Sequence, residues 1–297
     1  MQPPSRDFRH ATSAALYLAA AAVLFAIMAV VAKRAAVRLP GPEVAFIRFL
    51  VGLLACLGAA TRVRLRANNW RGLFLRGLFG GGAVLCYFLG IEHLPVGVAT
   101  LLNYTAPVFT ALWAALFLRE PLGLSAVGAL VLTTVGVGLV IYGGAPPGSL
   151  GFGTWQLVGV LSALLSGAAI ATIREVRRTD GSWEIFAAFC FGGAIITGVP
   201  AARGWVQPSP REWLLTVAVG ALAVVAQLVM TWSLRYLRAA VAGIIMQLTP
   251  VAAMVLGYLL YGERAVGVAI AGAVITLAGV CWGALLAARP QTPVEEP

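Results

Sequence analysis

The chain has 297 residues, of which 60% are hydrophobic and 11% charged, and its formal net charge is +10. So few polar side chains cannot coat a water-soluble globule of this size, which predicts an integral membrane protein. Lys and Arg lie in short breaks between apolar runs, as membrane topology signals do, and no basic patch is interleaved with aromatic residues, which argues against nucleic-acid binding. The four cysteines lie inside apolar runs without paired spacing, as small core residues do.

Apolar runs divide the chain into ten predicted membrane-spanning helices, each close to the ~20 residues that cross hydrocarbon. A short polar tail, residues 1–10, precedes a first helix that is too long for a cleavable signal peptide and ends at Lys33 and Arg34. The uncharged, Gly- and Pro-rich segment 143–153 is interpreted as a linker, and residues 288–297 as a disordered cytoplasmic tail. The helices are expected at about 11–37, 43–60, 72–91, 95–118, 122–142, 154–174, 183–201, 212–236, 239–261 and 264–287.

The two halves of the sequence match each other without a gap at a constant shift, the one that carries Pro107 onto Pro250. A repeat at half the chain length indicates a duplicated bundle rather than a solenoid. Because each copy, 11–142 and 154–287, has an odd number of helices, the second copy must enter the membrane from the opposite side, which predicts a 5+5 inverted repeat. Lys and Arg are more numerous on the breaks that share a side with the N-terminus, so both termini are expected in the cytoplasm. Matching pairs include Gly77/Gly220, Leu94/Leu237, Val98/Val241, Glu120/Glu263 and Gly136/Gly279.

An inverted repeat predicts an alternating-access carrier with its site between the halves, the alternative being a duplicated scaffold without transport. Polar residues lie beside Pro107 and Pro250, and polar groups at mid-depth usually face a cavity. Both prolines are expected inside continuous helices, as hinges or as packing kinks, where they loosen the carbonyls of Asn103 and Met246. A weaker set follows helices 72–91 and 212–236, where Arg76, Gly80, Ala83 and Tyr87 form one stripe. Candidate substrate-binding residues are Tyr17, Arg76, Tyr87, Asn103, Tyr104, Trp155, Gln227, Thr231 and Gln247, with Tyr17 and Trp155 alternatively serving as interfacial anchors.

All eleven acidic residues lie in tails or at helix ends, and both histidines are peripheral. No buried carboxylate is therefore expected to exchange protons, which favours facilitated movement over proton antiport, and neither a metal site nor a cofactor is expected. The halves should enclose one pocket without charged groups, unless Arg48 or Arg76 faces it. Arginine in a cavity would favour a carboxylate- or phosphate-bearing substrate, whereas both side chains could also snorkel to the helix ends.

Each copy combines a proline-bearing helix, a short connection and a Gly-rich helix. The connections read Arg119-Glu120-Pro121-Leu122 and Gly262-Glu263-Arg264-Ala265, and the Gly-rich helices contain TTVGVGLVIY and TLAGVCWGAL. Over about residues 11–287 this pattern resembles the EamA-type carriers of the drug/metabolite transporter superfamily. The resemblance implies a central cavity lined by the first, third and fourth helices and their mates. Glu120 and Glu263 match family positions, but each could equally stabilise the start of the following helix through its dipole.

The resemblance also implies export of amino acids and related metabolites across the bacterial inner membrane, and one branch of these carriers handles aromatic amino acids. Tyr87 and Tyr104 would then pack a substrate side chain, while Asn103, Gln227 and Gln247 would bond the zwitterion. The partners expected are a small-molecule substrate and the lipid bilayer, with a monomer sufficient for transport. The alternatives are a nucleotide-sugar or phosphate-ester carrier and, from another class, a membrane-embedded enzyme acting on lipid-linked substrates. That enzyme would require clustered His, Asp or Glu at the membrane surface, so we expect no enzymatic activity.

Overall fold

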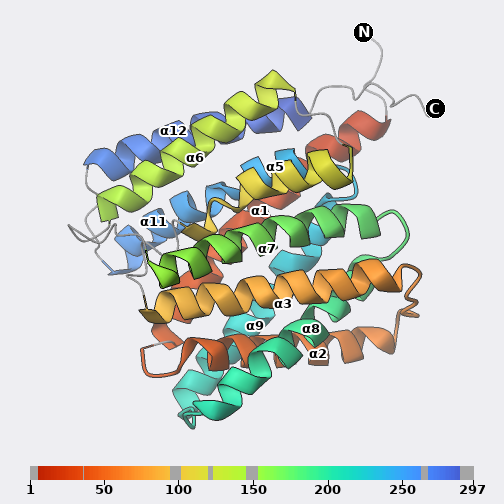
Figure 1. Cartoon of the computed structure of the whole chain (residues 1–297), viewed down its shortest axis with the longest axis vertical. Helices are drawn as coiled ribbons and strands as arrows, with labels where there is room; N and C mark the ends of the chain where they lie inside the picture. Colours follow the sequence, from red (N-terminus) through yellow and green to blue (C-terminus); the bar gives the residue numbers. More distant parts are fainter. Residues whose placement is uncertain are drawn as a thin grey trace.

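The computed structural model describes residues 6–35, 37–93, 102–119, 123–144, 153–261 and 267–287, which form helices and short connections with no strand. The helices run nearly parallel to one another through a single bundle (Figure 1). Those of the first half are α1 (Arg6–Ala35), α2 (Gly41–Ala60), α3 (Trp70–His93), α5 (Ala106–Phe117) and α6 (Leu124–Gly144). Those of the second half are α7 (Thr154–Val176), α8 (Ser182–Arg203), α9 (Pro210–Ser233), α10 (Ala239–Met246), α11 (Leu248–Tyr261) and α12 (Gly267–Ala287).

Most helices begin and end within a few residues of the positions predicted from hydropathy. Two predictions were wrong. The helix expected over 239–261 is interrupted at Gln247 and forms two helices, α10 and α11, and the helix expected over 95–118 is interrupted by a turn at residues 104 and 105. Pro250 lies in the first turn of α11 and Pro107 in the first turn of α5, where a missing amide hydrogen costs no hydrogen bond. Both prolines therefore begin a helix instead of interrupting one. Glu120, Glu263 and most of the expected linker lie outside the described residues.

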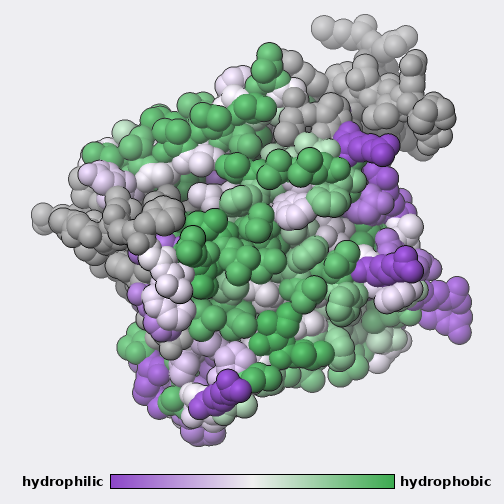
Figure 2. Space-filling model, in the orientation of Figure 1, coloured by the Kyte–Doolittle hydropathy of each residue, from purple (hydrophilic) through white to green (hydrophobic). Residues whose placement is uncertain are grey.

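The surface of the bundle is that of a membrane protein. Among the described helices, six are long and apolar enough to cross a membrane by length and composition, namely α1, α2, α3, α7, α8 and α9. Shorter apolar stretches lie in α5, α6 and α12, and one more runs through α10 into α11. Figure 2 shows hydrophobic residues over the middle of the visible face and hydrophilic ones toward its two ends, as expected for an apolar belt between two polar membrane surfaces.

The two halves pack through contacts that occur in equivalent pairs. The repeat shift carries α1 to α7, α2 to α8, α3 to α9, α5 to α11 and α6 to α12. Accordingly, α3 packs on α7 as α9 packs on α1, α3 on α8 as α9 on α2, and α5 on α7 as α11 on α1. The equivalent helices α6 and α12 pack against each other. The two halves are therefore interlocked, because helices of each half pack against helices of the other half.

Connections from different halves meet at the two ends of α2. Beyond Ala60, the backbone amides of Asn68 and Asn69 donate to the Asp180 carboxylate at 2.8 and 3.1 Å, which joins the α2–α3 and α7–α8 connections. Near Gly41, the Arg38 guanidinium donates to the Glu212 carboxylate at 3.0 Å, and the Val206 amide donates to Glu43 at 2.8 Å. The α7–α8 connection thus lies at the C-terminal end of α2. Its repeat equivalent, the α1–α2 connection, lies at the opposite, N-terminal end of α2.

Glycines allow α6 and α12 to approach closely, which gives a first prediction. A Cβ at Gly136 would lie 2.6 Å from the Thr276 amide nitrogen and 2.8 Å from the Gly272 carbonyl oxygen, both backbone atoms that cannot rotate away. We expect Gly136→Ala to destabilise the protein by about 1–3 kcal/mol. Gly138→Ala is the matched control, because nothing lies within 4 Å of that Cβ. Thermal unfolding in detergent measures both, and equal midpoints would contradict the close approach.

Candidate functional site

Both proline-bearing segments are broken at the centre of the bundle. Before α5, residues 104 and 105 form a turn, and between α10 and α11 a turn is formed at Gln247. These breaks free backbone groups that a continuous helix would use internally, and irregular backbone at membrane depth is tolerated where it is buried in protein or lines a cavity. The carbonyl that gains a partner from the other half is that of Tyr104, next to the Asn103 carbonyl that Pro107 is predicted to loosen.

A single hydrogen bond joins the two breaks. The Gln247 Nε2 donates to the Tyr104 carbonyl oxygen at 3.0 Å, and the two residues are separated by 143 positions, which is the repeat shift itself. Two repeat-equivalent residues therefore touch here, so this bond lies where the two halves meet at the centre of the bundle. The Gln247 side chain is fully buried, and its Oε1 has no hydrogen-bond partner among the described residues.

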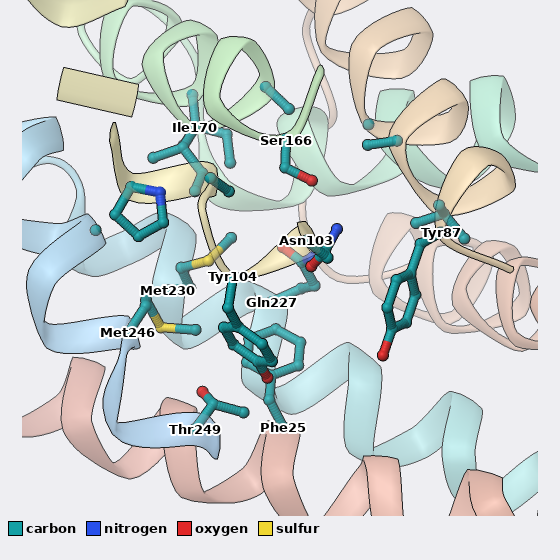
Figure 3. A pocket seen from close by; sticks show the side chains of 18 of the residues that line it. Phe25, Tyr87, Asn103, Tyr104, Ser166, Ile170, Gln227, Met230, Met246 and Thr249 are labelled. Carbon is teal, nitrogen blue, oxygen red and sulfur yellow. The ribbon is translucent and has the colours of Figure 1, made fainter. Parts of the chain in front are cut away.

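A cavity of about 250 Å³ surrounds this point. It is lined by helices of both halves, with one half contributing α1, α2, α3, the turn before α5 and the first residues of α5, and the other α7 to α11. Figure 3 shows the Tyr104 ring beside Phe25, Met230 and Met246, with Tyr87 on the other side of Asn103. The polar or charged lining residues are Arg48, Arg76, Tyr87, Asn103, Tyr104, Ser166, Gln227, Gln247 and Thr249.

A short chain of hydrogen bonds fixes one wall of the cavity. The Asn103 Nδ2 donates to the Ser162 Oγ at 2.7 Å, and the Ser162 hydroxyl donates to the Ala83 carbonyl at 2.9 Å. Ser162 is fully buried. The chain therefore ties the segment before α5 to α7 and α3, so that Asn103 is held in position beside the cavity.

Two arginines also line the cavity, so the expectation of a pocket without charged groups was wrong. Arg76 is 3% exposed and Arg48 is 9% exposed, and neither side chain snorkels to the end of its helix. The Arg76 guanidinium donates to the Gln227 Oε1 at 3.5 Å and lies 3.9 Å from the centroid of the Phe189 ring. The described lining residues include no Asp or Glu, which leaves the cavity cationic.

The structure brings most of the predicted binding residues to this cavity. Six of the candidates line it, as does Pro107, and so do all members of the α3 stripe. Three candidates lie elsewhere in the described part of the chain. Tyr17 is 55% exposed and packs its edge against Trp232, Trp155 stacks on His93 at 3.5 Å, and Thr231 is buried outside the lining. The candidates at the cavity are Arg76, Tyr87, Asn103, Tyr104, Gln227 and Gln247.

Sequence reasoning missed the apolar residues of the cavity. Phe25 and Met28 of α1, Ile170 of α7, and Met230 and Met246 all line it. An apolar residue in an apolar helix gives no signal of which way it faces, because lipid and cavity walls favour the same side chains. On α3, by contrast, the helical spacing of small and polar residues indicated which face of the helix lines the cavity.

Comparison with known proteins agrees with this architecture. Residues 12–142 and 153–283 each match the model of the EamA-like transporter family. The pseudopaline exporter CntI of Pseudomonas aeruginosa is 27% identical over 89% of this chain and 93% of its own length. The riboflavin transporter of Rhizobium johnstonii is 28% identical, over 77% of this chain and 75% of its own length. A solved crystal structure with 22% sequence identity has a TM-score of 0.79 and covers 93% of this chain and 97% of that one, which shows a shared fold.

Proposed function

Because the chain belongs to the EamA-like transporter family, we propose that it is an alternating-access carrier that exports amino acids, aromatic ones above all, or related small metabolites. The observation that carries the proposal is the Gln247–Tyr104 hydrogen bond where the two halves meet, within a cavity that both halves line. A site between two similar, oppositely directed halves can open to either side when the halves exchange conformations.

The membrane topology that fits this mechanism is ten spans arranged as a 5+5 inverted repeat, with copies at 11–142 and 154–287. The opposite placement of the α1–α2 and α7–α8 connections supports it. Arg174 donates to the carbonyls of Leu234 and Arg235 at 3.0 and 2.7 Å, so the α9–α10 connection lies at the same end as the α7–α8 and α2–α3 connections. Arginines concentrate in these three connections, which places that end in the cytoplasm by the positive-inside rule. The start of α1 and the end of α12 lie together in Figure 1, which supports cytoplasmic termini at the bacterial inner membrane.

The size and lining of the cavity favour a small, partly apolar substrate. Its 250 Å³ lies below the range of about 300–1,000 Å³ that is usual for drug-sized ligands. Phe25, Tyr87 and Tyr104 supply aromatic surface, while Asn103 and Gln247 supply amide groups. The direction of transport is supported by the relative named as a pseudopaline exporter.

A phosphate-ester carrier is the second candidate, because Arg48 and Arg76 both line the cavity. Arginine binds phosphate and carboxylate oxygens with the same planar fork. A nucleotide sugar is a poorer fit for a cavity of 250 Å³ than an amino acid. Competition between the two substrate classes in one assay distinguishes them.

We expect proteoliposomes loaded with unlabelled phenylalanine to accumulate external labelled phenylalanine by counterflow at equal pH on both sides. Unlabelled tryptophan should compete and glucose 6-phosphate should not. Asn103→Ala should lower the rate by about tenfold, since one lost hydrogen bond to a charged substrate is worth roughly 1.5–3 kcal/mol. Liposomes without protein serve as the control. Competition by glucose 6-phosphate alone would favour the second candidate, and a strict need for a pH gradient would contradict facilitated movement.

A further inference from the structure

Two buried cations of the first half lie near the same aromatic ring. The centres of the Arg76 and Arg48 guanidinium groups lie 3.9 and 5.8 Å from the Phe189 ring centroid, and Arg48 lies 5.1 Å from the ring of Phe49. Positive charge over an aromatic face is favourable, and more so away from water. These rings therefore hold both guanidinium groups in place without neutralising either charge.

No acidic side chain compensates these charges in the described part of the chain. The ion pairs there join Arg38 to Glu212 and Arg178 to Glu175, well away from the cavity. Among the described residues the Arg76 Nε has no hydrogen-bond partner, and the 3.5 Å distance to Gln227 is long for a charged donor. A buried charge that no opposite charge compensates is strongly unfavourable, so two such charges in one cavity indicate a site for an anionic group.

The helices provide space for this arrangement. A Cβ at Gly80 would overlap the Arg76 guanidinium and lie 2.6 and 2.8 Å from two carbons of the Phe189 ring. Glycine at position 80 leaves room for the Arg76 side chain to lie along α3 and reach the Phe189 ring. The equivalents of Arg48 and Arg76 in the second half are Phe191 and Val219, both apolar, so only one side of the cavity is cationic.

We infer that Arg76 and Arg48 form a subsite for the carboxylate of the transported molecule. The inference rests on the proposed function, because it assigns the subsite to one end of an amino acid. Arginine presents parallel N–H donors that match the two oxygens of a carboxylate, and bound substrate would neutralise charge that the described lining residues leave uncompensated. The carboxylate then lies near α2, α3 and α8, and the apolar end of the substrate lies toward Tyr104 and Phe25.

The test uses the full chain in detergent with benzoate as probe and benzamide as its uncharged counterpart. Benzoate should raise the thermal unfolding midpoint of the native protein, and benzamide should not. Arg76→Met should weaken benzoate binding at least about tenfold, while leaving the midpoint without ligand unchanged or higher, because it removes an uncompensated buried charge. Arg71→Met, at an exposed position of the same helix, is the matched control and should keep the benzoate response.

Equal responses to benzoate and benzamide, or a full benzoate response in Arg76→Met, would overturn the subsite. So would stabilisation by phenyl phosphate without any by benzoate. If Arg76→Met does not fold, Gly80→Ala keeps the test open, because it displaces the guanidinium without removing its charge and should also weaken benzoate binding. An unchanged benzoate affinity in Gly80→Ala would then contradict the inference.

The benzoate binding assay tests the subsite and the counterflow assay tests the proposed function, so the two proposals can fail separately. Counterflow of phenylalanine together with an Arg76-independent benzoate response would leave the transport proposal standing and remove the subsite. Arg76-dependent benzoate binding without counterflow of any amino acid would support the anion subsite and contradict amino-acid export. Where counterflow occurs, phenylalaninamide should compete far more weakly than phenylalanine, because it lacks the carboxylate.

Discussion

Replacing Gly192 by leucine is expected to lower the stability of the protein by roughly 3 kcal/mol or more and to abolish transport. A Cβ at this position would lie 2.7 Å from the Cα and carbonyl carbon of Gly77, where α8 crosses α3. Backbone atoms cannot rotate away from an added side chain, so the two helices must separate. Because α3 carries Arg76 and α8 carries Phe189, that separation also disrupts the cationic side of the cavity.

Gly58→Leu is the matched control, because nothing lies within 4 Å of a Cβ at that position of α2. Thermal unfolding in detergent measures stability, and phenylalanine counterflow measures transport. Native-like unfolding and transport by Gly192→Leu would show that α3 and α8 are not in backbone contact. A loss in Gly58→Leu as large as that in Gly192→Leu would show that the effect is not specific to the crossing.

Hydropathy predicted the helices well because membrane spans are defined by length and apolar composition. The same signal could not identify which helices touch. Gly77 and Gly220 were recognised as equivalent positions, but not that each packs on a helix of the other half, Gly77 on α8 and Gly220 on Val51 of α2. These contacts depend on how two halves interlock, and that arrangement is a property of the whole bundle rather than of any local window.

The interruption at Gln247 shows a second limit of sequence reasoning. Pro250 alone predicts a kink within a helix, since its ring clashes with the carbonyl of Met246. The backbone instead forms a turn one residue later, where the Gln247 side chain bonds the Tyr104 carbonyl of the other half. The break falls at equivalent positions in both copies, three residues before Pro107 and Pro250, and the hydrogen bond that joins the two breaks could not be predicted from either copy alone.

The sequence left open whether the two arginines face the cavity or the helix ends. In the sequence, Arg48 and Arg76 lie close enough to helix ends to snorkel, and that reading required no partner. Packing of α2, α3 and α8 around Phe189 instead encloses both side chains beside the cavity. The composition of single helices cannot reveal this, because the enclosing ring belongs to the other repeat.

Gln247→Leu is expected to lower counterflow at least about tenfold and stability by about 1–3 kcal/mol. Leucine nearly preserves the volume of the side chain but removes the donor to the Tyr104 carbonyl, which then stays buried without that partner. In the proposed mechanism the two turns move together when the halves exchange conformations, and this bond is the direct link between them. Gln156→Leu, which changes the same residue type outside the cavity lining, should retain native transport.

A purely packing role for Gln247 makes a different prediction. In that case Gln247→Leu should keep both transport and stability, because an apolar side chain of similar size fills the same buried space. Loss of stability with normal transport would assign the hydrogen bond to the fold alone. Transport should also be measured at a temperature where the variant remains folded. A loss of transport there would assign the hydrogen bond to the conformational exchange, because both halves are intact and only the link between them has been removed.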